Sequence, residues 1–379
     1  MKSIIIVNSK CYPIDDDGGT CFTTYEVAKS AELHGFKAGV LIPRIFGRET
    51  KEYDGSLISQ KGLIKFCSFL YKKLRSKNII YYNCGYNPHI ILTLFIAYLC
   101  KINHQLNATI LFSGHGSFDH ILSSGILKKI WISLIIIPFM RLTKCTYILN
   151  SDGEYDAIYP DIKALDGIKF YTAQNAFPSF TFMHDAEETK SIIDNSHEPY
   201  FDFRYVLYLG RIVRKKRLME TIKFLDMNEW FQKGGKLLIA HVNDDEKYLE
   251  EIRSYLDTCD FKENIVFMGK VHGAKKWSLI LNACAFILLS ISEGLPMAIL
   301  EADYLGIPVI LTKECNYIPE TEKSIICTDI TEKDYNGHLS EIYERKLDPS
   351  SIFEEIDNAS FHASKGFLST YYDIFNEIK

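Results

Sequence analysis

Two glutamates in the last third of the chain, Glu293 and Glu301, have the residue type and the spacing to bind hydroxyl groups of a sugar. A carboxylate accepts hydrogen bonds from two vicinal hydroxyls, such as those of a ribose. The apolar run over 285–289 predicts a buried strand ahead of Glu293, and Pro296 suits a first helical residue, which tolerates a missing N–H. Gly306 ends the predicted helix and a second apolar run follows, so the segment is typical of a βαβ unit. Both acids then lie on the ligand side of a parallel sheet.

The loop between the two acids also suits an anion. Unpaired N–H groups at a helix start bind phosphate, and the amides from Gly294 to Ala298 can serve in this way. Glu301 stands five residues further, ~7.5 Å along the helix axis, so it cannot reach that phosphate but can reach a neighbouring hydroxyl. The alternative is an exposed loop Glu and a solvated helix Glu, which the spacing alone would favour. The residues of this segment that we expect to bind the ligand are Gly294, Leu295, Pro296, Met297 and Glu301.

A basic turn follows another predicted strand, with the sequence GRIVRKKR over 210–217. Arg211 lies just past the strand end and Lys216 near the next helix, so both can point into the same crevice. There they would neutralise a diphosphate, Arg as a planar fork and Lys as a point charge. The turn holds more cations than a diphosphate needs. The other three are interpreted as a solvated surface: Arg214, Lys215 and Arg217.

The basic turn and the acidic pair together resemble the retaining glycosyltransferases of family 4. The marks of that family are a Gly-Arg turn followed five residues on by Lys, and two Glu with seven residues between them. The resemblance covers most of residues 203–327 and implies the GT-B fold, an α/β architecture of two Rossmann-like domains facing across a cleft. It also implies sugar transfer from a nucleotide diphosphate donor with retention, with no metal ion or other cofactor required. The catalytic residues that it implies are Glu293, Arg211 and Lys216.

Length and composition predict two domains. The chain has 379 residues, of which 47% are apolar, and this is ample for two cores. We expect an N-terminal, acceptor-side Rossmann-like domain over 1–177 and a C-terminal nucleotide-sugar-binding domain over 203–359. The polar stretch 178–202 is interpreted as the connection between them. A helix over 360–379 is expected to rejoin the first domain.

Two further candidates for donor binding follow predicted strands in the N-terminal half. Residues 4–7 lead to a glycine loop, and we favour a contact of Gly19 with the donor because glycine lets the backbone approach a ligand closely; the alternative is a simple turn. His115 follows a strand over 110–113. The resemblance implies that it contacts the donor sugar, whereas a lone histidine is as often a structural hydrogen-bonding group. Three positions hold other residues where the family commonly has Gly: Ala176, Arg217 and His241.

Positive charge is concentrated in one segment. Residues 51–150 hold twelve Lys and Arg against three acids, a balance of +9, whereas the whole chain carries −5 and the remainder therefore −14. This uneven distribution of charge indicates peripheral contact with an anionic membrane, with 63–77 as a surface helix. The runs 89–100 and 130–140 are apolar on every face and are expected to be mostly buried in protein. An equally weighted alternative is core helices with a solvated basic edge.

Cysteine spacing and missing motifs limit the location and the partners that we expect. Ten cysteines without a CxxC pair and the lack of a signal peptide predict a cytoplasmic chain, peripheral at most to the inner membrane face. No nucleic-acid motif is present, so no nucleic-acid partner is expected. The sequence predicts a glycosyltransferase that takes a nucleotide sugar and a saccharide or lipid-linked acceptor, in cell-surface polysaccharide synthesis such as that of lipopolysaccharide or O-antigen. Two alternatives stay open: a non-catalytic nucleotide-sugar-binding subunit, and a nucleotide-sugar epimerase of the same fold.

Overall fold

The chain divides into two compact units, and each is described by itself. The first comprises residues 1–176 with 365–379, and the second comprises 177–364. The computed structural model describes residues 3–7, 23–24, 27–28, 31–32, 35–44, 57–61, 63–83, 88–114, 132–150, 167–173, 203–241, 245–344, 371 and 374.

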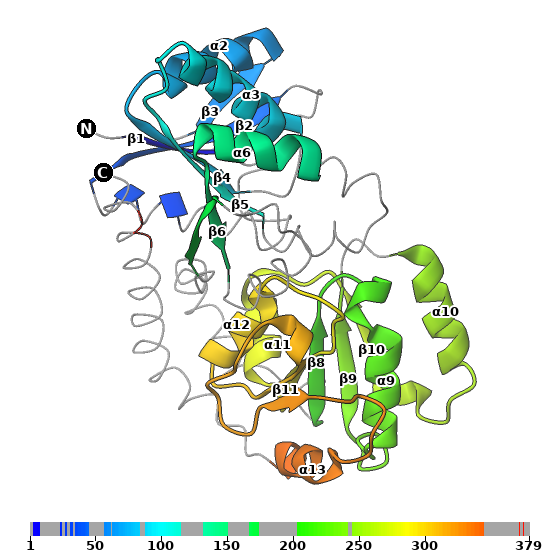
Figure 1. Cartoon of the computed structure of the whole chain (residues 1–379). Coiled ribbons are helices and arrows are strands. Elements are labelled where there is room, and N and C mark those ends of the chain that lie inside the picture. The colour runs from blue at the N-terminus through cyan, green and yellow to red at the C-terminus, as the bar shows by residue number, and fades with distance from the viewer. Residues whose placement is uncertain are drawn as a thin grey trace. The chain divides into compact units, whose positions relative to one another are not determined.

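The first unit is built on a seven-stranded parallel sheet with the order β3-β2-β1-β4-β5-β6-β7 (Figure 1). The strand order reverses between β1 and β4, as in doubly wound sheets. Its strands are β1 (Ser3–Val7), β2 (Lys37–Arg44), β3 (Leu57–Lys61), β4 (Asn78–Asn83), β5 (Thr109–Ser113), β6 (Thr146–Leu149) and β7 (Lys169–Thr172). Its helices include α2 (Leu63–Leu74), α3 (Pro88–Ile102) and α6 (Ile137–Thr143), the last preceded by a π-helical turn, η1 (Ile132–Ile136).

Alternation along the strands gives this sheet two apolar faces. Ile5 of β1 enters one buried cluster and Ile4 the other, since successive side chains of a strand point to opposite faces. Helices α2, α3 and α6 cover the first cluster. The second cluster includes Tyr371 and Ile374 from the C-terminal end, and the Tyr371 hydroxyl lies 2.9 Å from that of Tyr81. Residues far apart in the sequence therefore complete the core of the first unit.

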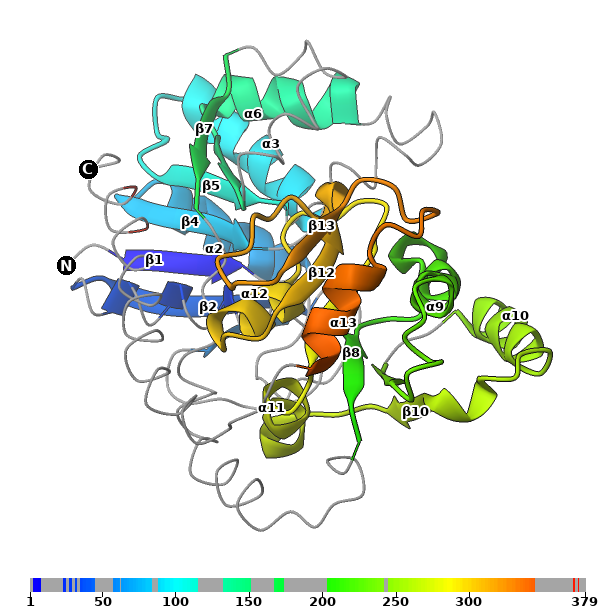
Figure 2. The same ribbon diagram turned by 90° about the horizontal axis from the view of Figure 1, so that it is seen from below.

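The second unit is built on a six-stranded parallel sheet with the order β10-β9-β8-β11-β12-β13 (Figure 2). Its strands are β8 (Tyr205–Leu209), β9 (Lys236–Ala240), β10 (Ile265–Gly269), β11 (Ala285–Leu288), β12 (Val309–Thr312) and β13 (Ile325–Cys327). Its α-helices are α9 (Leu218–Met227), α10 (Glu246–Leu256), α11 (Gly273–Leu281), α12 (Met297–Tyr304) and α13 (Asn336–Glu344). Counted from β8, the order matches that of the first six strands of the other sheet, and it reverses between β8 and β11.

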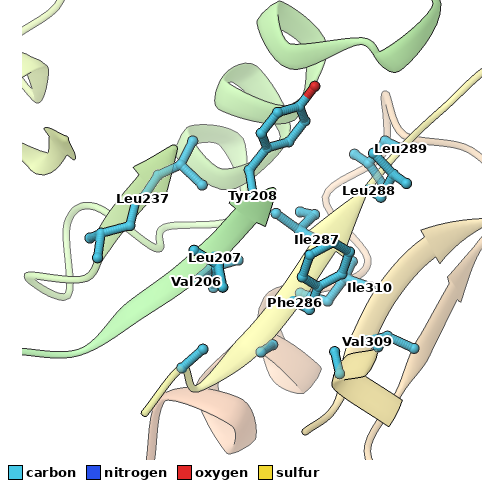
Figure 3. Packing of buried hydrophobic residues seen from close by; sticks show 14 of the residues in the cluster. Val206, Leu207, Tyr208, Leu237, Phe286, Ile287, Leu288, Leu289, Val309 and Ile310 are labelled. Carbon is cyan, nitrogen blue, oxygen red and sulfur yellow. The ribbon is translucent and has the colours of Figure 1, made fainter. Parts of the chain in front are cut away.

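The central strands of the second sheet are buried on both faces. Leu207 of β8, Ile287 of β11 and Ile310 of β12 are fully buried together with their strand neighbours (Figure 3). Strands covered on both sides are continuous apolar runs rather than alternating ones, which is the pattern that the sequence has here. This core fixes the strand ends from which the functional side chains extend.

The predicted fold class is confirmed, since the chain forms two parallel-sheet α/β units. Helix α12 ends as predicted, with Gly306 in the left-handed region at φ 67°. Its start is one residue later than predicted. Pro296 is extended, at φ −74° and ψ 122°, and its carbonyl accepts the Ile299 amide at 3.1 Å, so that Met297 is the first helical residue.

Helices α3 and α6 are mostly buried or half-buried, with a few exposed apolar side chains. Phe95, Leu99 and Ile102 are exposed on α3, as are Leu134 in η1 and Leu142 on α6. The prediction that the runs 89–100 and 130–140 are mostly buried is confirmed for their described residues, of which only Phe95, Leu99 and Leu134 are exposed. Within the part of the chain that the structure describes, no helix is both long enough and apolar enough to span a bilayer.

Candidate functional site

The basic turn after β8 folds back over its own strand end. The Gly210 amide donates to a carbonyl of β9 at 3.0 Å, and the Tyr208 hydroxyl donates to the Arg211 carbonyl at 2.9 Å. A short 3₁₀ helix, η5 (Arg214–Lys216), then returns the chain toward the sheet. A Cβ placed on Gly210 would lie 3.4 Å from Lys216 Nζ. The end of the Lys216 side chain therefore lies close to the Gly210 backbone at the strand end.

Two positions where the resembling family commonly has Gly have distinct local roles. Arg217 joins η5 to α9 in the left-handed region, at φ 51° and ψ 42°, a conformation that favours glycine. The arginine adopts it here at a cost in backbone strain. His241 continues β9 by donating its amide to the Gly269 carbonyl at 2.9 Å, with its ring edge-on to Phe267.

Glu293 and Lys216 extend from neighbouring strands and form an ion pair. Strands β8 and β11 are adjacent in the sheet, so the segments that follow them meet at one edge. Lys216 Nζ lies 3.2 Å from Glu293 Oε1, and the Ser290 hydroxyl donates to the same oxygen at 2.9 Å. The side chains of Lys216 and Glu293 are each 13% exposed, so water screens their attraction only weakly.

Lys215 also faces this carboxylate. Its Nζ lies 3.9 Å from Glu293 Oε2, and its carbonyl accepts the Ile291 amide at 2.9 Å. The interpretation of Lys215 as part of a solvated surface is therefore wrong. Both lysines belong to the short turn η5, which returns the chain toward the sheet, and local sequence does not show this return.

The ionisation of Glu293 follows from these neighbours. Burial alone would raise the pKa of its carboxyl group, but the positive charges of Lys216 and Lys215 and the hydrogen bond from Ser290 outweigh burial. The pKa of Glu293 is therefore lowered from its ordinary value of 4.5. At neutral pH the group is a carboxylate, which accepts hydrogen bonds and stabilises positive charge but has no proton to donate.

The turn after β12 holds the backbone of Glu293. The Glu293 amide donates to the Glu314 carbonyl at 2.9 Å, and Asn316 Nδ2 donates to the Glu293 carbonyl at 2.6 Å. The Thr312 hydroxyl donates to the Ser290 carbonyl at 2.7 Å. Because β12 is the neighbour of β11, the loops after both strands are joined by these bonds.

Glu301 is paired inside the second unit. Its side chain is 3% exposed, and Lys276 Nζ of α11 donates to Glu301 Oε1 at 2.6 Å. Lys276 Nζ also lies 4.4 Å from the centroid of the Trp277 ring. A buried carboxylate requires such a partner, since an isolated charge would be strongly disfavoured. The alternative interpretation of Glu301 as a solvated helix residue is therefore wrong.

The remaining cations of the basic turn differ in their partners. Arg214 forms two bonds to the Glu251 carboxylate, at 2.6 and 2.7 Å, and lies over the Tyr248 ring, so the interpretation as a solvated residue holds for it. Arg211 is exposed, and among the described residues no carboxylate forms an ion pair with it. Its guanidinium is available to an incoming anion.

Helix α12 starts at Met297, four residues after Glu293. The first N–H groups of a helix have no carbonyl partner within the helix. Pro296, just before the first helical residue, has no N–H. Leu295 and Met297 flank it, and Gly294 follows Glu293 in the loop. The predicted phosphate-binding segment is thus next to the Lys216–Glu293 pair along the chain.

The structure therefore brings Lys216 together with Glu293 and places Arg211 at the same strand end. Two predicted site residues, Gly19 and His115, lie outside the described residues. Sequence reasoning missed three further contacts, and for two of them, those of Ser290 and Asn316, the available signal is a polar residue just past a predicted strand end. The third is the contact of Lys276. Among the described residues, no group of three or more His, Cys, Asp or Glu is arranged to hold a metal ion.

Known proteins resemble parts of this chain in sequence. The model of the family described as glycosyl transferases group 1 matches residues 189–334. The GDP-mannose:cellobiosyl-diphosphopolyprenol alpha-mannosyltransferase of Komagataeibacter xylinus is 21% identical over 222 residues, 58% of this chain and 50% of that protein. The chain thus matches about half the length of this curated relative.

Solved structures resemble the chain over its whole length. Sucrose-phosphate synthase from Thermosynechococcus elongatus has a TM-score of 0.70 and 13% identity, over 100% of this chain and 99% of that chain. HepE from Anabaena in complex with UDP-glucose has a TM-score of 0.67 and 12% identity, with the same coverage. These likenesses show the GT-B fold. Together with the family match, they support a GT-B glycosyltransferase.

Proposed function

We propose that this protein is a retaining glycosyltransferase that moves a sugar from a nucleotide diphosphate donor to a saccharide or lipid-linked acceptor. The observation that carries the proposal is the buried Lys216–Glu293 pair at the strand ends of the second sheet, 3.2 Å apart, with the start of α12 a few residues further along the chain. We place the reaction at the cytoplasmic face of the membrane, in the synthesis of a cell-surface polysaccharide such as lipopolysaccharide or O-antigen.

The proposed chemistry follows from the charges of these groups. Lys216, Arg211 and the amides at the start of α12 stabilise the leaving diphosphate as its negative charge develops, which lowers the barrier of the transition state. Glu293, ionised and held by Ser290, contacts the transferring sugar. The second oxygen of Glu301 accepts the ribose hydroxyls while Lys276 holds the first. The cations meet the phosphate charge, so the proposal includes no metal ion or other cofactor.

A panel of nucleotide sugars tests donor binding. UDP-glucose and GDP-mannose come first, because HepE was solved with UDP-glucose and the mannosyltransferase relative uses GDP-mannose. A true donor at 100 times its Kd stabilises the fold by ~2.7 kcal/mol, measured as a rise in Tm. The absence of a rise with every nucleotide sugar would contradict the proposal.

Turnover separates the proposed activity from its alternatives. With donor and a polyprenol diphosphate-linked glycan, a transferase releases free nucleoside diphosphate and forms a glycosidic bond whose anomeric configuration NMR can compare with that of the donor. Binding without release would indicate a non-catalytic subunit. Conversion of the nucleotide sugar to its epimer would indicate an epimerase, and an inverted product would contradict retention.

We also propose that the first unit contacts an anionic membrane through the helical layer of α2, α3, η1 and α6. Helix α3 packs against both α2 and α6, so the layer is continuous. Of the eleven large apolar side chains exposed in the described part of the chain, eight belong to this layer, including Ile64 at 85% and Leu134 at 70%. The eight are Leu63, Ile64, Tyr71, Phe95, Leu99, Ile102, Leu134 and Leu142.

The charge of this layer complements anionic head groups. The segments 63–77, 88–114 and 132–150 contain eight Lys and Arg and no Asp or Glu. Arg75 lies 5.1 Å from the centroid of the Tyr71 ring, so cation and aromatic ring share one exposed surface. Each Lys or Arg near an anionic surface contributes ~1 kcal/mol, so several suffice for reversible binding. A lipid-linked acceptor would then lie in the surface that the enzyme contacts.

Vesicle sedimentation at low salt tests this surface. The protein should pellet with vesicles that contain phosphatidylglycerol but not with neutral vesicles, and Glu at Lys72, Lys73 and Arg75 should abolish pelleting. The matched control places the same three charge changes on the second unit, at exposed Lys247, Lys323 and Lys333. Equal loss in both triple variants, or no pelleting of the wild type, would contradict the membrane contact and favour a soluble acceptor. A dimer in solution that buries the layer would contradict it too.

A further inference from the structure

Asn316 contacts the backbone of Glu293 from a neighbouring strand end. It ends the short 3₁₀ turn η7 (Lys313–Cys315) after β12, and its Nδ2 donates to the Glu293 carbonyl at 2.6 Å across 23 residues of sequence. On the other side of the same residue, the Glu293 amide donates to the Glu314 carbonyl at 2.9 Å. Both backbone polar groups of Glu293 are therefore held by this one turn.

Holding the Glu293 carbonyl also fixes the next peptide plane. In a trans peptide the C=O and the following N–H point in opposite directions. With the Glu293 carbonyl directed at Asn316, the Gly294 amide points to the opposite side, and Gly294 begins the segment proposed to bind the donor phosphate. The Asn316 side-chain amide thus fixes the orientation of the Glu293 backbone and of the peptide that follows it.

The conformation of Asn316 does not require its side chain. The residue lies in the left-handed region at φ 53°, where glycine is the least strained residue and asparagine is tolerated. Glycine would make the same turn without an amide to donate. Other bonds join the two loops, from Thr312 to the Ser290 carbonyl and from Cys315 Sγ to the Leu288 carbonyl at 3.4 Å. These bonds hold the residues before Glu293, whereas Asn316 holds Glu293 itself.

We propose that Asn316 is a positioning residue for sugar transfer, which holds the backbone of Glu293 so that its carboxylate meets the transferring sugar. The proposal rests on the proposed function. It predicts that loss of the Asn316 side-chain amide lowers kcat more than it raises the KM of the nucleotide sugar, since Glu293 acts at the transferring sugar.

Asn316→Gly tests the role of the donor group, because it keeps the left-handed turn and removes the amide. We expect kcat to fall about tenfold, with the donor KM changed less than threefold, as 1.4 kcal/mol corresponds to a tenfold change in rate. Lys323→Gly is the matched control, since Lys323 is exposed and has φ 64°. It introduces the same backbone freedom without touching Glu293. Asn316→Asp is nearly isosteric, lacks the donor, and should reduce kcat at least as much.

A second readout does not depend on turnover. The pKa of the Glu293 carboxyl, followed by carbon-13 NMR, should rise in Asn316→Gly as the carboxylate moves away from Lys216, and it should stay unchanged in Lys323→Gly. If both Asn316 variants lowered Tm but left kcat and this pKa unchanged, Asn316 would be only structural and the proposal would be overturned. If the wild type transferred no sugar but the pKa of Glu293 still rose in Asn316→Gly, the proposed function would fail. The role of Asn316 in positioning Glu293 would stand.

Discussion

The two units share a strand order and differ in where they place their charges. In the second unit, cations and acids near the strand ends turn toward each other. Lys216 pairs with Glu293 and Lys276 with Glu301, and each of these side chains is 13% exposed or less. In the helical layer of the first unit, the described segments have cations without any acid, and most of these cations are exposed. The same strand order thus carries buried ion pairs in the second unit and an exposed basic surface in the first. The fold alone therefore does not determine what each unit does.

Burial determines how strongly each charge should matter. Removing one partner of a buried pair leaves an uncompensated charge, whereas most exposed pairs contribute about 0–1 kcal/mol. Substitutions at the strand ends of the second unit should therefore have large effects, and matched substitutions on exposed pairs should have small ones.

Glu293→Gln should have the largest effect on turnover. Loss of a charged group that acts at the reacting centre lowers kcat by about 10²–10³-fold. Steady-state kinetics with the identified donor measures it. Glu251→Gln is the control, because Glu251 carries the same charge in an exposed pair with Arg214. Similar kcat values for the two variants would remove the distinction between the buried and the exposed pair.

Lys216→Ala and Arg211→Ala should each weaken donor binding by about 1.5–3 kcal/mol, since each removes a charge-assisted bond to phosphate. Isothermal titration with the donor measures this change, and circular dichroism checks that the fold persists. Arg214→Ala should change the Kd little, because its guanidinium is engaged by Glu251. Unchanged affinity in both the Lys216 and Arg211 variants would refute their assignment to the phosphate.

Glu301→Gln should mainly raise the donor KM, by roughly tenfold, with kcat nearly unchanged. Its proposed contact is with the ribose, which does not change in the reaction. The variant also leaves Lys276 buried without a carboxylate, so Tm should fall. If Glu301→Gln and Glu293→Gln showed the same pattern of kcat and KM, the separate roles of the two acids would be wrong.

The smallest effect should be the pH dependence of stability. The pKa of Glu293 is lowered in the folded state, so its ionised form contributes stability that is fully present above the ordinary value of 4.5. This contribution is lost as the pH falls through the lowered pKa. The difference in free energy of unfolding between wild type and Glu293→Gln should thus be constant above about pH 5.5 and shrink below 4.5. A difference that grew toward acid pH would mean a raised pKa.

Much of the fold follows from local sequence. The run Phe286–Leu289 and the run after Pro308 are apolar throughout, and a strand buried on both faces needs that pattern, so these strands and the helix between them were predictable. The helical layer was harder. A helix that is apolar on every face predicts burial, and most of the described residues of α3 are buried or half-buried, but Phe95 and Leu99 are exposed. Sequence periodicity does not report how many layers cover a helix.

The site was predictable only where a motif spans a short distance. Arg211, Lys216 and Glu293 each follow a strand, so the chain itself places them at the sheet edge. Asn316 and Lys276 reach the site through neighbouring strands and helices, and their contacts depend on the strand order, which local patterns do not encode. Lys275 and Lys276 are adjacent and identical in type, and only the packing of α11 directs the second toward Glu301.

The ion pair at 3.2 Å would make the proposed donor binding an exchange of partners. A diphosphate at Lys216 would replace the Glu293 carboxylate as the partner of the ammonium, so the affinity gained from this lysine is what remains after the bond to Glu293 is given up. The same exchange would release the carboxylate to meet the sugar at the moment the donor binds. When the diphosphate departs, the Glu293 carboxylate would form its ion pair with Lys216 again. Glu293 thus occupies, at Lys216, the position proposed for the leaving diphosphate.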